Sequence, residues 1–456
     1  MPFRTLFLLA LACCASAVAD PVDEAVLREM KQARIPGVGI VVLQDGKIVK
    51  EQGYGLANIE HQVSVAPETV FQSGSVGKMF TAALVMLLAE DGKLKLDDLV
   101  SRHLAHTPKA WEAITIRHLL THTSGLGDPY ARLDFRKDYS DEELIALEAT
   151  IPMLSAPGER WAYSNMGYHL LGFICNKVGG KFYGDQLRER IFAPLGMSTR
   201  IISESDIVPH RAAGYELVNG VLKNQSWVAP RLNTTADGSL YLTAHDLALW
   251  DLAISGDKVL SEKIKTASWT PVKLNDGTTA NYGYGWALDP VNGHRTISHS
   301  GAWQGFKTMM SRFVDDKLTV IVLANSASAR PGKLVNLVAS AYVPSLEIAV
   351  AKAIADNEPQ VTAVVRAVVS ELAKGSLAGG VFNAKAAAMF PPSWLKSLSE
   401  QMGELGALRS VELLERKPDG EMRGYRYRFI YTEQRLLVAV TFDKANKIDQ
   451  LMLRPE

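Results

Sequence analysis

Hydrophobic and polar positions near the start of the chain alternate in the way that β-strands require. The stretch GVGIVVLQDGKIVKEQG contains strand-like residues at 38–43 and 48–53, and Asp45-Gly46 stands between them. An Asp-Gly pair between two such runs is a strong signal for a tight two-residue turn. The pattern therefore predicts a β-hairpin in this region.

The next pattern is the almost wholly apolar run within FQSGSVGKMFTAALVMLLAEDG, residues 71–92. It predicts a buried helix that begins at Ser75 and ends near Gly92. A lysine, Lys78, nevertheless stands at the head of this helix, three residues after Ser75. Because residues i and i+3 share one face of a helix, we expect the two side chains to be adjacent.

Helical patterns dominate residues 97–200, and strand-like stretches return between 282 and 325. These stretches are YGYGWALDP, HRTISHSG, KTMMSRFVDD and LTVIVLAN. The hairpin at 38–53 and the strands at 282–325 thus flank the helical region. This order predicts one sheet formed by N- and C-terminal segments, with a helical insert between them.

The pattern changes again after residue 345. Residues 346–375 are rich in alanine and valine and helical in pattern, and GYRYRFIYTEQRLLVAVTFDKANKIDQLMLRP contains three alternating strands. Helices beside antiparallel strands predict a small α+β domain in which one face of the sheet is covered. The expected organisation is a signal peptide at 1–19, a large domain at 20–345 and a small α+β domain at 346–456.

Composition and charge exclude several functional classes. The 456 residues are 47% hydrophobic and 21% charged, which is ordinary for a globular protein. The formal net charge is zero and no run of lysine or arginine stands out, so nothing favours binding to nucleic acid or to an anionic membrane surface. Beyond the first residues, no apolar segment reaches the length needed to span a bilayer.

The first residues, MPFRTLFLLALACCASAVAD, resemble a secretory signal. Arg4 provides the positive start, an apolar stretch follows, and Ala17-Val18-Ala19 has the small residues of a cleavage site. A secreted or periplasmic protein is therefore expected. A lipoprotein acylated at Cys13 or Cys14 is the less favoured alternative, because Ala10 stands where a lipoprotein signal prefers leucine.

Cleavage after Ala19 would leave Cys175 as the single cysteine, so no internal disulfide is expected. Cys175 stands in the apolar run YHLLGFICNKVGG. This setting is typical of a buried packing cysteine rather than of a nucleophile.

Ser75 and Lys78 together have the residue types that nucleophilic catalysis needs. A serine hydroxyl is a poor nucleophile until a base takes its proton, and a lysine can act as that base when burial or nearby charge lowers its pKa. Ser75 would also stand at a helix N-terminus, where free N–H groups can hold an oxyanion. Taken alone, however, Ser-x-x-Lys is common, and a capping serine followed by a surface lysine is the simpler interpretation.

Two further motifs add chemistry to this pair. Tyr163 and Asn165 form Tyr-x-Asn, in which a tyrosine could act as a base beside cations and an amide could bind a substrate carbonyl. The segment HRTISHSGAWQGF contains His299 and Gly301, where a histidine could supply positive charge beside Tyr163 and a glycine permits close backbone approach. Taken singly, each motif has a structural interpretation, as a turn before a helix or as a structural histidine.

The three motifs in this order resemble the penicillin-recognising serine hydrolases. The branch they resemble contains class C β-lactamases, D-alanyl-D-alanine carboxypeptidases, D-aminopeptidases and β-lactamase-fold esterases. The resemblance covers about 30–345 and includes the phrases ITIRHLLTHTSGL at 114–126, RIFAPLGMSTR at 190–200, ADGSLYLTAHDLALW at 236–250 and YGYGW at 282–286. It implies an α+β fold of the β-lactamase/transpeptidase-like type, with an antiparallel sheet flanked by helices and an all-helical lobe.

The resemblance also implies a role for each motif residue. Ser75 would be acylated, while Lys78 and Tyr163 would manage its proton. The backbone N–H groups of Ser75 and Ala302 would form the oxyanion hole. No metal and no cofactor are implied, and the residues that would bind substrate are Asn165, His299, Ser300, Gly301 and Ala302.

Position 299 departs from the class C β-lactamases, which usually have a lysine there. A histidine binds a substrate carboxylate only when it is protonated, so efficient β-lactamase activity is doubtful. The expected function is therefore an exported serine hydrolase acting on small acyl esters or D-amino-acid peptides, with a small molecule or short peptide as substrate. The alternatives are a β-lactamase or D-alanyl-D-alanine carboxypeptidase proper, a non-catalytic binding protein, and a cell-wall scaffold.

The C-terminal domain is similar in pattern to cystatin-like or nuclear-transport-factor-like modules. Docking, formation of a homodimer, or partial cover of the active site are its expected roles. Elsewhere, His118 and His122 have the spacing of a zinc pair, but Leu119 stands where the glutamate of H-E-x-x-H would be, so both are interpreted as structural.

Overall fold

The computed structural model describes residues 20–130, 132–203, 205–347, 351–387, 389–403, 405–419, 422–432 and 434–455. The predicted signal segment at 1–19 lies outside these residues. The chain divides into two compact units, Met1–Ile348 and Ala349–Glu456, and each is described by itself. Among the described residues, no helix combines the length and the apolar character needed to cross a bilayer.

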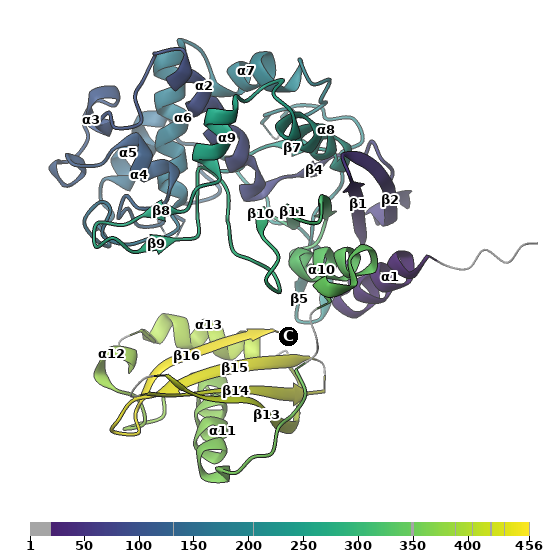
Figure 1. Ribbon diagram of the computed structural model, residues 1–456, viewed down its shortest axis with the longest axis vertical. Helices are drawn as coiled ribbons and strands as arrows, with labels where there is room; N and C mark the ends of the chain where they lie inside the picture. The colour runs from purple at the N-terminus through teal and green to yellow at the C-terminus, as the bar shows by residue number, and fades with distance from the viewer. Residues whose placement is uncertain are drawn as a thin grey trace, which may run out of the picture. The chain divides into compact units, whose positions relative to one another are not determined.

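The first unit is built on a six-stranded antiparallel sheet in the order β10-β11-β12-β1-β2-β3 (Figure 1). N-terminal and C-terminal parts of the unit meet at its centre, where β1 pairs with β12, and the predicted hairpin is confirmed as β1 and β2. The strands are β1 (Gly37–Gln44), β2 (Lys47–Asn58), β3 (Val63–Ser64), β10 (Thr296–Trp303), β11 (Phe306–Phe313) and β12 (Leu318–Ala324).

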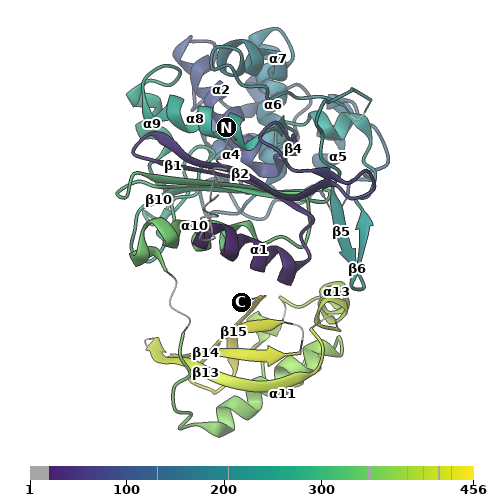
Figure 2. The ribbon, with the colours of Figure 1, turned by 90° about the vertical axis from the view of Figure 1, so that its right-hand side faces the viewer.

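Both faces of this sheet are covered, which explains why β1 is an almost unbroken apolar run. Val38, Ile40 and Val42 pack into the core beneath helices α1 (Pro21–Ala33) and α10 (Pro331–Tyr342). Val41 and Leu43 point into the larger core on the opposite face, which helix α8 (Ala244–Ser255) covers (Figure 2).

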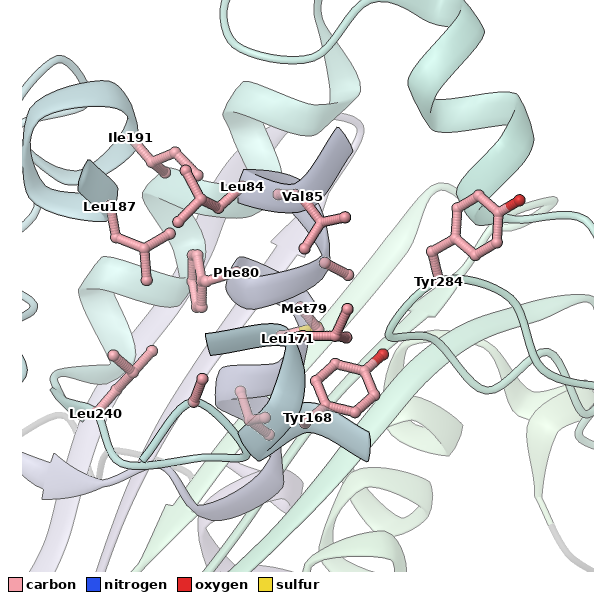
Figure 3. Packing of buried hydrophobic residues seen from close by; sticks show 14 of the residues in the cluster. Met79, Phe80, Leu84, Val85, Tyr168, Leu171, Leu187, Ile191, Leu240 and Tyr284 are labelled. Atoms are coloured by element: carbon pink, nitrogen blue, oxygen red, sulfur yellow. The ribbon is translucent and has the colours of Figure 1, made fainter. Parts of the chain in front are cut away.

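The helical lobe surrounds α2, which is buried on all sides from Lys78 to Leu88. Figure 3 shows Phe80 and Leu84 of this helix facing Leu187 and Ile191. A helix that is apolar on all sides is expected in the protein interior, so the buried helix predicted from residues 71–92 is confirmed. The remaining helices of this unit are α3 (Val100–His103), α4 (Ile116–Leu120), α5 (Asp141–Glu148), α6 (Asn165–Gly179), α7 (Tyr183–Leu187) and α9 (Glu262–Ser268), with α2 itself at Lys78–Glu90.

Short elements complete the first unit. One of them, the 3-10 turn η1 (Gly74–Gly77), leads into α2 and contains Ser75. The others are η2 (Lys109–Trp111), η3 (Arg188–Phe192), η4 (Pro230–Thr234), η5 (Pro344–Leu346), and the strand pairs β4 (Phe71–Gln72) with β7 (Tyr241–Leu242), β5 (Tyr215–Val218) with β6 (Val221–Asn224), and β8 (Val272–Lys273) with β9 (Thr279–Ala280).

One predicted strand of this unit is wrong. The segment YGYGWALDP forms only isolated bridges, between Tyr282 and Ala287 and between Ala287 and Ser298. Gly285 has φ +77°, and a Cβ at this position would lie 2.9 Å from the carbonyl oxygen of Lys78. This left-handed backbone conformation is incompatible with a β-strand, and only glycine lets the chain pass so close to α2.

The second unit contains a four-stranded antiparallel sheet in sequence order, β13-β14-β15-β16. Its core includes Val365, Tyr427 and Val438, so helix α11 packs on one face of the sheet as expected for an α+β domain. The elements are α11 (Pro359–Ala373), α12 (Ala384–Ala387), α13 (Pro392–Gly403), β13 (Leu408–Asp419), β14 (Met422–Tyr431), β15 (Arg435–Phe442) and β16 (Ile448–Pro455).

Two predictions for this unit need correction. Strand β13 was not predicted, because the charged residues of LRSVELLERKPD obscure its alternation. The helix predicted from residue 346 begins only at Pro359, which stands at its first position. Before it, Ile354 donates its N–H to the carbonyl oxygen of Leu413, so this part of the chain runs beside the sheet rather than as a helix.

Candidate active site

Ser75 lies where η1 passes against β10, at the edge of the six-stranded sheet. A Cβ at Gly301 would lie 2.1 Å from the carbonyl oxygen of Ser73 and 3.1 Å from the nitrogen of Ser75. Gly74 has φ +51°, and a Cβ there would lie 2.4 Å from the nitrogen of Ala302. Side chains at either glycine would force the two segments apart. The two backbone segments that carry the nitrogens of Ser75 and Ala302 therefore pass in close contact, which an oxyanion hole built from both would require.

Lys78 is fully buried and its amine has three partners. Nζ lies 3.0 Å from Ser75 Oγ and 2.8 Å from Asn165 Oδ1, and it donates to the carbonyl oxygen of Asp237. These contacts compensate the cost of burying a polar group. When the amine is uncharged, Asn165 and Asp237 take its two hydrogens and its lone pair faces the Ser75 hydroxyl. Lys78 is therefore placed to accept the proton of Ser75.

Asn165 begins α6, and two partners orient its amide. Its Oδ1 accepts a hydrogen bond from Lys78, and its Nδ2 donates to Asp128 Oδ2 at 2.8 Å. These opposite partners distinguish the amide oxygen from the nitrogen. One hydrogen of Nδ2 remains for a substrate carbonyl. Asp128 is exposed, so a solvent-facing carboxylate stands beside this group.

Tyr163 is half-buried and lies beside Lys78, with its ring centroid 5.1 Å from Nζ. The ring of His122 stacks against it with a centroid separation of 4.1 Å, and the ring of His299 lies 6.3 Å away. Within the described part of the chain, the Tyr163 hydroxyl has no hydrogen-bond partner. Ring packing therefore sets the position of this side chain.

His299 is buried beside Tyr163, and both of its nitrogens are engaged. Nε2 lies 2.9 Å from the Tyr282 hydroxyl, and Nδ1 lies 2.6 Å from the carbonyl oxygen of Ser300. Burial, followed by the charge of Lys78, lowers the pKa of His299 to about 3. This low pKa favours a neutral imidazole near pH 7, which argues against the expectation that His299 supplies positive charge beside Tyr163.

The neighbours of His299 on β10 alternate in exposure. The side chain of Ser300 is exposed, Gly301 is buried against η1, and Ala302 is exposed. The strand thus presents Ser300 and Ala302 to the solvent side of the site. All eight predicted site residues lie in the first unit, on η1, on α2, in the loop just before α6, at the start of α6 and on β10.

The low pKa of His299 makes a prediction about acid stability. Between pH 6.5 and about 3 the unfolded chain binds a proton at this histidine and the folded chain does not, so the free energy of unfolding should fall as the pH drops through this range. In the His299→Gln variant this contribution is absent. Urea unfolding followed by tryptophan fluorescence at pH 7.5, 5.5 and 4.5 should show a smaller acid-induced loss in the variant, and an equal loss in both proteins would contradict the buried neutral state.

A buried ionic cluster supports the site from behind. His169 on α6 places Nδ1 2.6 Å from Glu148 Oε1 and Nε2 3.2 Å from Asp237 Oδ1, and the Tyr130 hydroxyl donates to Asp237. Burial opposes protonation of His169, but the charges of Asp237 and then Glu148 raise its pKa to about 10. An imidazolium therefore holds Asp237, whose carbonyl oxygen accepts from Lys78.

Sequence reasoning missed several groups of this site. Asp128 lay in no recognised motif, while His122, Asp237 and Tyr282 stood in recognised phrases but were given no role at the site. A signal existed for His169, which is an ionisable residue inside the apolar run YHLLGFIC. His118, the other histidine of the rejected zinc pair, accepts the N–H of Thr115 in a helix-capping contact.

The arrangement contains the parts that acyl transfer needs. It brings together a hydroxyl, an amine whose lone pair can take the hydroxyl proton, two converging backbone nitrogens and an oriented amide. A phenol lies beside the amine and can exchange protons with a leaving group.

Comparison with known proteins adds independent findings. The model of the family described as Beta-lactamase matches residues 22–341. Penicillin-binding protein 4* of Bacillus subtilis (strain 168) is 33% identical over 306 residues, which cover 63% of this chain and 67% of that protein. The D-aminopeptidase of Gluconobacter oxydans (strain 621H) is 28% identical over 309 residues, which cover 65% of this chain and 57% of that protein.

Among solved structures, the octameric penicillin-binding protein homologue from Pyrococcus abyssi is similar over both units. It is 25% identical with a TM-score of 0.65, and the match covers 95% of this chain and 94% of that chain. The likeness extends beyond residue 341, where the match to the family model ends.

Proposed function

The chain belongs to the beta-lactamase family of serine hydrolases, and from this premise we propose that it forms an acyl-enzyme on Ser75 and hydrolyses esters or amides. The substrates in this proposal are small acyl esters or D-amino-acid peptides. The observation that carries it is the 3.0 Å contact between Lys78 Nζ and Ser75 Oγ, with Asn165 and Asp237 holding the rest of the amine.

The proposed reaction has two stages. Ser75 Oγ attacks the substrate carbonyl carbon while Lys78 takes the hydroxyl proton, and the N–H groups of Ser75 and Ala302 hold the resulting oxyanion. Tyr163 then passes a proton to the leaving alcohol or amine as the carbonyl forms again. In the second stage water attacks the carbonyl carbon of the acyl group on Ser75 while Tyr163 takes a proton from it. The bond between that carbon and Ser75 Oγ then breaks, Lys78 returns a proton to Oγ, and the acid is released.

The charges around the site support a substrate with a free ammonium group. Asp128 offers an exposed carboxylate that Asn165 holds in place, and neutral His299 offers no cation for a substrate carboxylate. The similarity to a D-aminopeptidase agrees with this preference. A β-lactamase or a D-alanyl-D-alanine carboxypeptidase, whose substrates carry a carboxylate, is the alternative.

Three half-buried rings support recognition of an apolar substrate group. Tyr130 lies 5.6 Å from Phe135 and 6.2 Å from Trp303 between ring centroids, and Trp303 directly follows Ala302. Rings packed in this way offer a rigid apolar surface beside the proposed oxyanion hole. In this proposal they contact the acyl group or the side chain of the substrate.

A substrate panel tests the proposal. Purified protein is incubated with p-nitrophenyl acetate, D-alanine p-nitroanilide and nitrocefin, and separately with a fluorescent fluorophosphonate followed by peptide mapping. We expect labelling at Ser75 and a higher kcat/KM for the ester and the D-alanine anilide than for nitrocefin. Nitrocefin as the best substrate would favour the alternative, and an unlabelled protein would contradict a serine hydrolase.

Asp128 makes a prediction about specificity. Asp128→Asn keeps an acceptor for the Nδ2 of Asn165 but removes the negative charge. KM for D-alanine p-nitroanilide should rise about tenfold, the size expected for losing a hydrogen bond to a charged group, while KM for p-nitrophenyl acetate should not change. Asp134→Asn, on the same loop, is the matched control because the Asp134 carboxylate accepts only the backbone N–H of Arg136 among the described residues. An equal rise in KM for both substrates would contradict the proposed contact between the Asp128 carboxylate and the substrate ammonium group.

We further propose export through the segment 1–19 and a homodimer formed through the C-terminal unit. The signal-like sequence supports export, and an octameric relative establishes assembly for that protein alone. Intact mass of the exported protein should correspond to a chain that begins at Asp20, and light scattering of the full chain should give twice the monomer mass.

A further inference from the structure

A chain of hydrogen bonds runs through three buried rings beside the active site. His122 is fully buried, and its Nδ1 accepts the backbone N–H of Ser164 at 3.2 Å. A neutral imidazole has one hydrogen, which must then be on Nε2. This nitrogen faces the Tyr282 hydroxyl at 3.2 Å, so His122 donates to Tyr282.

The other end of the chain is equally determined. His299 Nδ1 faces the carbonyl oxygen of Ser300 at 2.6 Å, and only a donor can face a carbonyl. The hydrogen of neutral His299 is therefore on Nδ1, and its Nε2 accepts the hydroxyl hydrogen of Tyr282 at 2.9 Å. The direction of donation is thus His122 to Tyr282, Tyr282 to His299, and His299 to Ser300.

Each end of this hydrogen-bond chain lies beside a group that the proposed reaction uses. His122 stacks against Tyr163, whose hydroxyl has no hydrogen bond within the described residues, so the orientation of His122 decides where Tyr163 sits. At the other end, His299 and Ser300 precede Gly301 and Ala302 on the edge strand β10.

The Tyr168 hydroxyl does not replace that of Tyr282 in this arrangement. Tyr168 also lies within hydrogen-bonding reach of Tyr282, but its own hydroxyl donates to the carbonyl oxygen of Leu120 at 2.9 Å. Without the Tyr282 hydroxyl, the Nε2–H of His122 would lose its acceptor and Nε2 of His299 would lose its donor. Buried polar groups left in this way are costly, so both rings would reorient.

We propose that Tyr282 is a positioning residue for the hydrolysis, because its hydroxyl joins Nε2 of His122 to Nε2 of His299 and so holds both rings, and through them Tyr163 and strand β10, in place. The inference rests on the proposed function, since it assigns Tyr163 and the N–H of Ala302 to the reaction. Tyr282 itself touches no reacting atom in this assignment.

The kinetic test compares Tyr282→Phe with Tyr284→Phe. Tyr284 belongs to the same segment, but its hydroxyl is bound by Arg117 instead. In Tyr282→Phe, the rate of fluorophosphonate labelling and kcat for p-nitrophenyl acetate should fall roughly tenfold, as for one lost buried hydrogen bond, with KM within about twofold. Tyr284→Phe should keep wild-type values.

A spectroscopic test covers the case in which Tyr282→Phe fails to fold. Long-range ¹H–¹⁵N spectra of histidine-labelled wild-type protein should show one ring protonated on Nε2 and one on Nδ1, assigned as His122 and His299 by their loss in His122→Asn and His299→Gln. In a folded Tyr282→Phe the Nε2 signals of both rings should shift, because each Nε2 loses the Tyr282 hydroxyl as its hydrogen-bond partner. His299→Gln combined with Tyr282→Phe should slow acylation less than the product of the two single effects.

The possible outcomes separate the two proposals. If wild-type protein is not labelled at Ser75, the proposed function fails and this inference fails with it. If it is labelled but Tyr282→Phe behaves like Tyr284→Phe, only the positioning role of Tyr282 is overturned. The opposite tautomers in wild-type protein would overturn it without any variant.

Discussion

Replacement of Ser75 by alanine should abolish turnover while leaving the protein folded. Ser75 Oγ lies 3.0 Å from Nζ of the buried Lys78, which is placed to take its proton. Its removal leaves the neighbouring groups nothing to activate, so kcat should fall by roughly 10⁴-fold or more, as for other lost nucleophiles. Hydrolysis of p-nitrophenyl acetate and circular dichroism of the purified variant measure the two parts of this expectation.

A mass measurement shows whether the lost activity belongs to the nucleophile itself. Wild-type protein mixed with a reactive ester should carry one acyl adduct, and peptide mapping should locate it on Ser75. The matched control is Ser300→Ala, which removes an exposed hydroxyl of β10 and should still be acylated on Ser75. An adduct on any other residue, or an acylated Ser75→Ala protein, would show that the nucleophile is wrongly assigned.

Lys78→Met should reduce kcat at least ~100-fold, the lower range for losing general-base assistance. Methionine keeps the length of the side chain and its packing against the rings of Tyr163 and Tyr168. It removes the amine that faces Ser75 and leaves the oxygens of Asn165 and Asp237 without their donor. The rate of fluorophosphonate labelling should fall with kcat, because the defect lies in acylation.

A second buried lysine provides the control for this variant. Lys265 on α9 is also almost fully buried, but it is paired with Asp257 and Glu262 and contacts no predicted site residue in the described structure. Lys265→Met should lower stability and leave kcat unchanged. If Lys78→Met retains near-wild-type labelling, Tyr163 alone activates the serine and the assignment of the base must change.

Patterns that depend on neighbours in the chain were predicted well from the sequence. The alternating strands and the Asp-Gly turn gave the hairpin of β1 and β2, and the apolar run gave the buried helix α2. The i, i+3 spacing brought Ser75 and Lys78 together, although Ser75 lies in a 3-10 turn before the helix. Local propensity and periodicity were sufficient for these features.

Properties that arise only from folding could not be predicted in the same way. The charge of His299 depends on how deeply the side chain is buried and on how close Lys78 lies to it. Both properties arise only in the folded protein. The contact between Asn165 and Asp128 joins residues far apart in the chain. The segment at 282–290 looked like a strand because its aromatic residues are typical of strands, yet the left-handed backbone at Gly285 excludes one.

The buried ionic cluster has a consequence for transplanting this chemistry to another protein. His169 lies between the carboxyl groups of Glu148 and Asp237, so a change at one of these three buried positions leaves the others uncompensated inside the protein. Breaking such a buried set costs about 3–5 kcal/mol. A substitution at one of these buried positions is therefore tolerated only with compensating substitutions at the others. A designer who grafts Ser-x-x-Lys alone onto a foreign scaffold would transfer the lysine without Glu148, His169 and Asp237, the buried residues that support its position from behind.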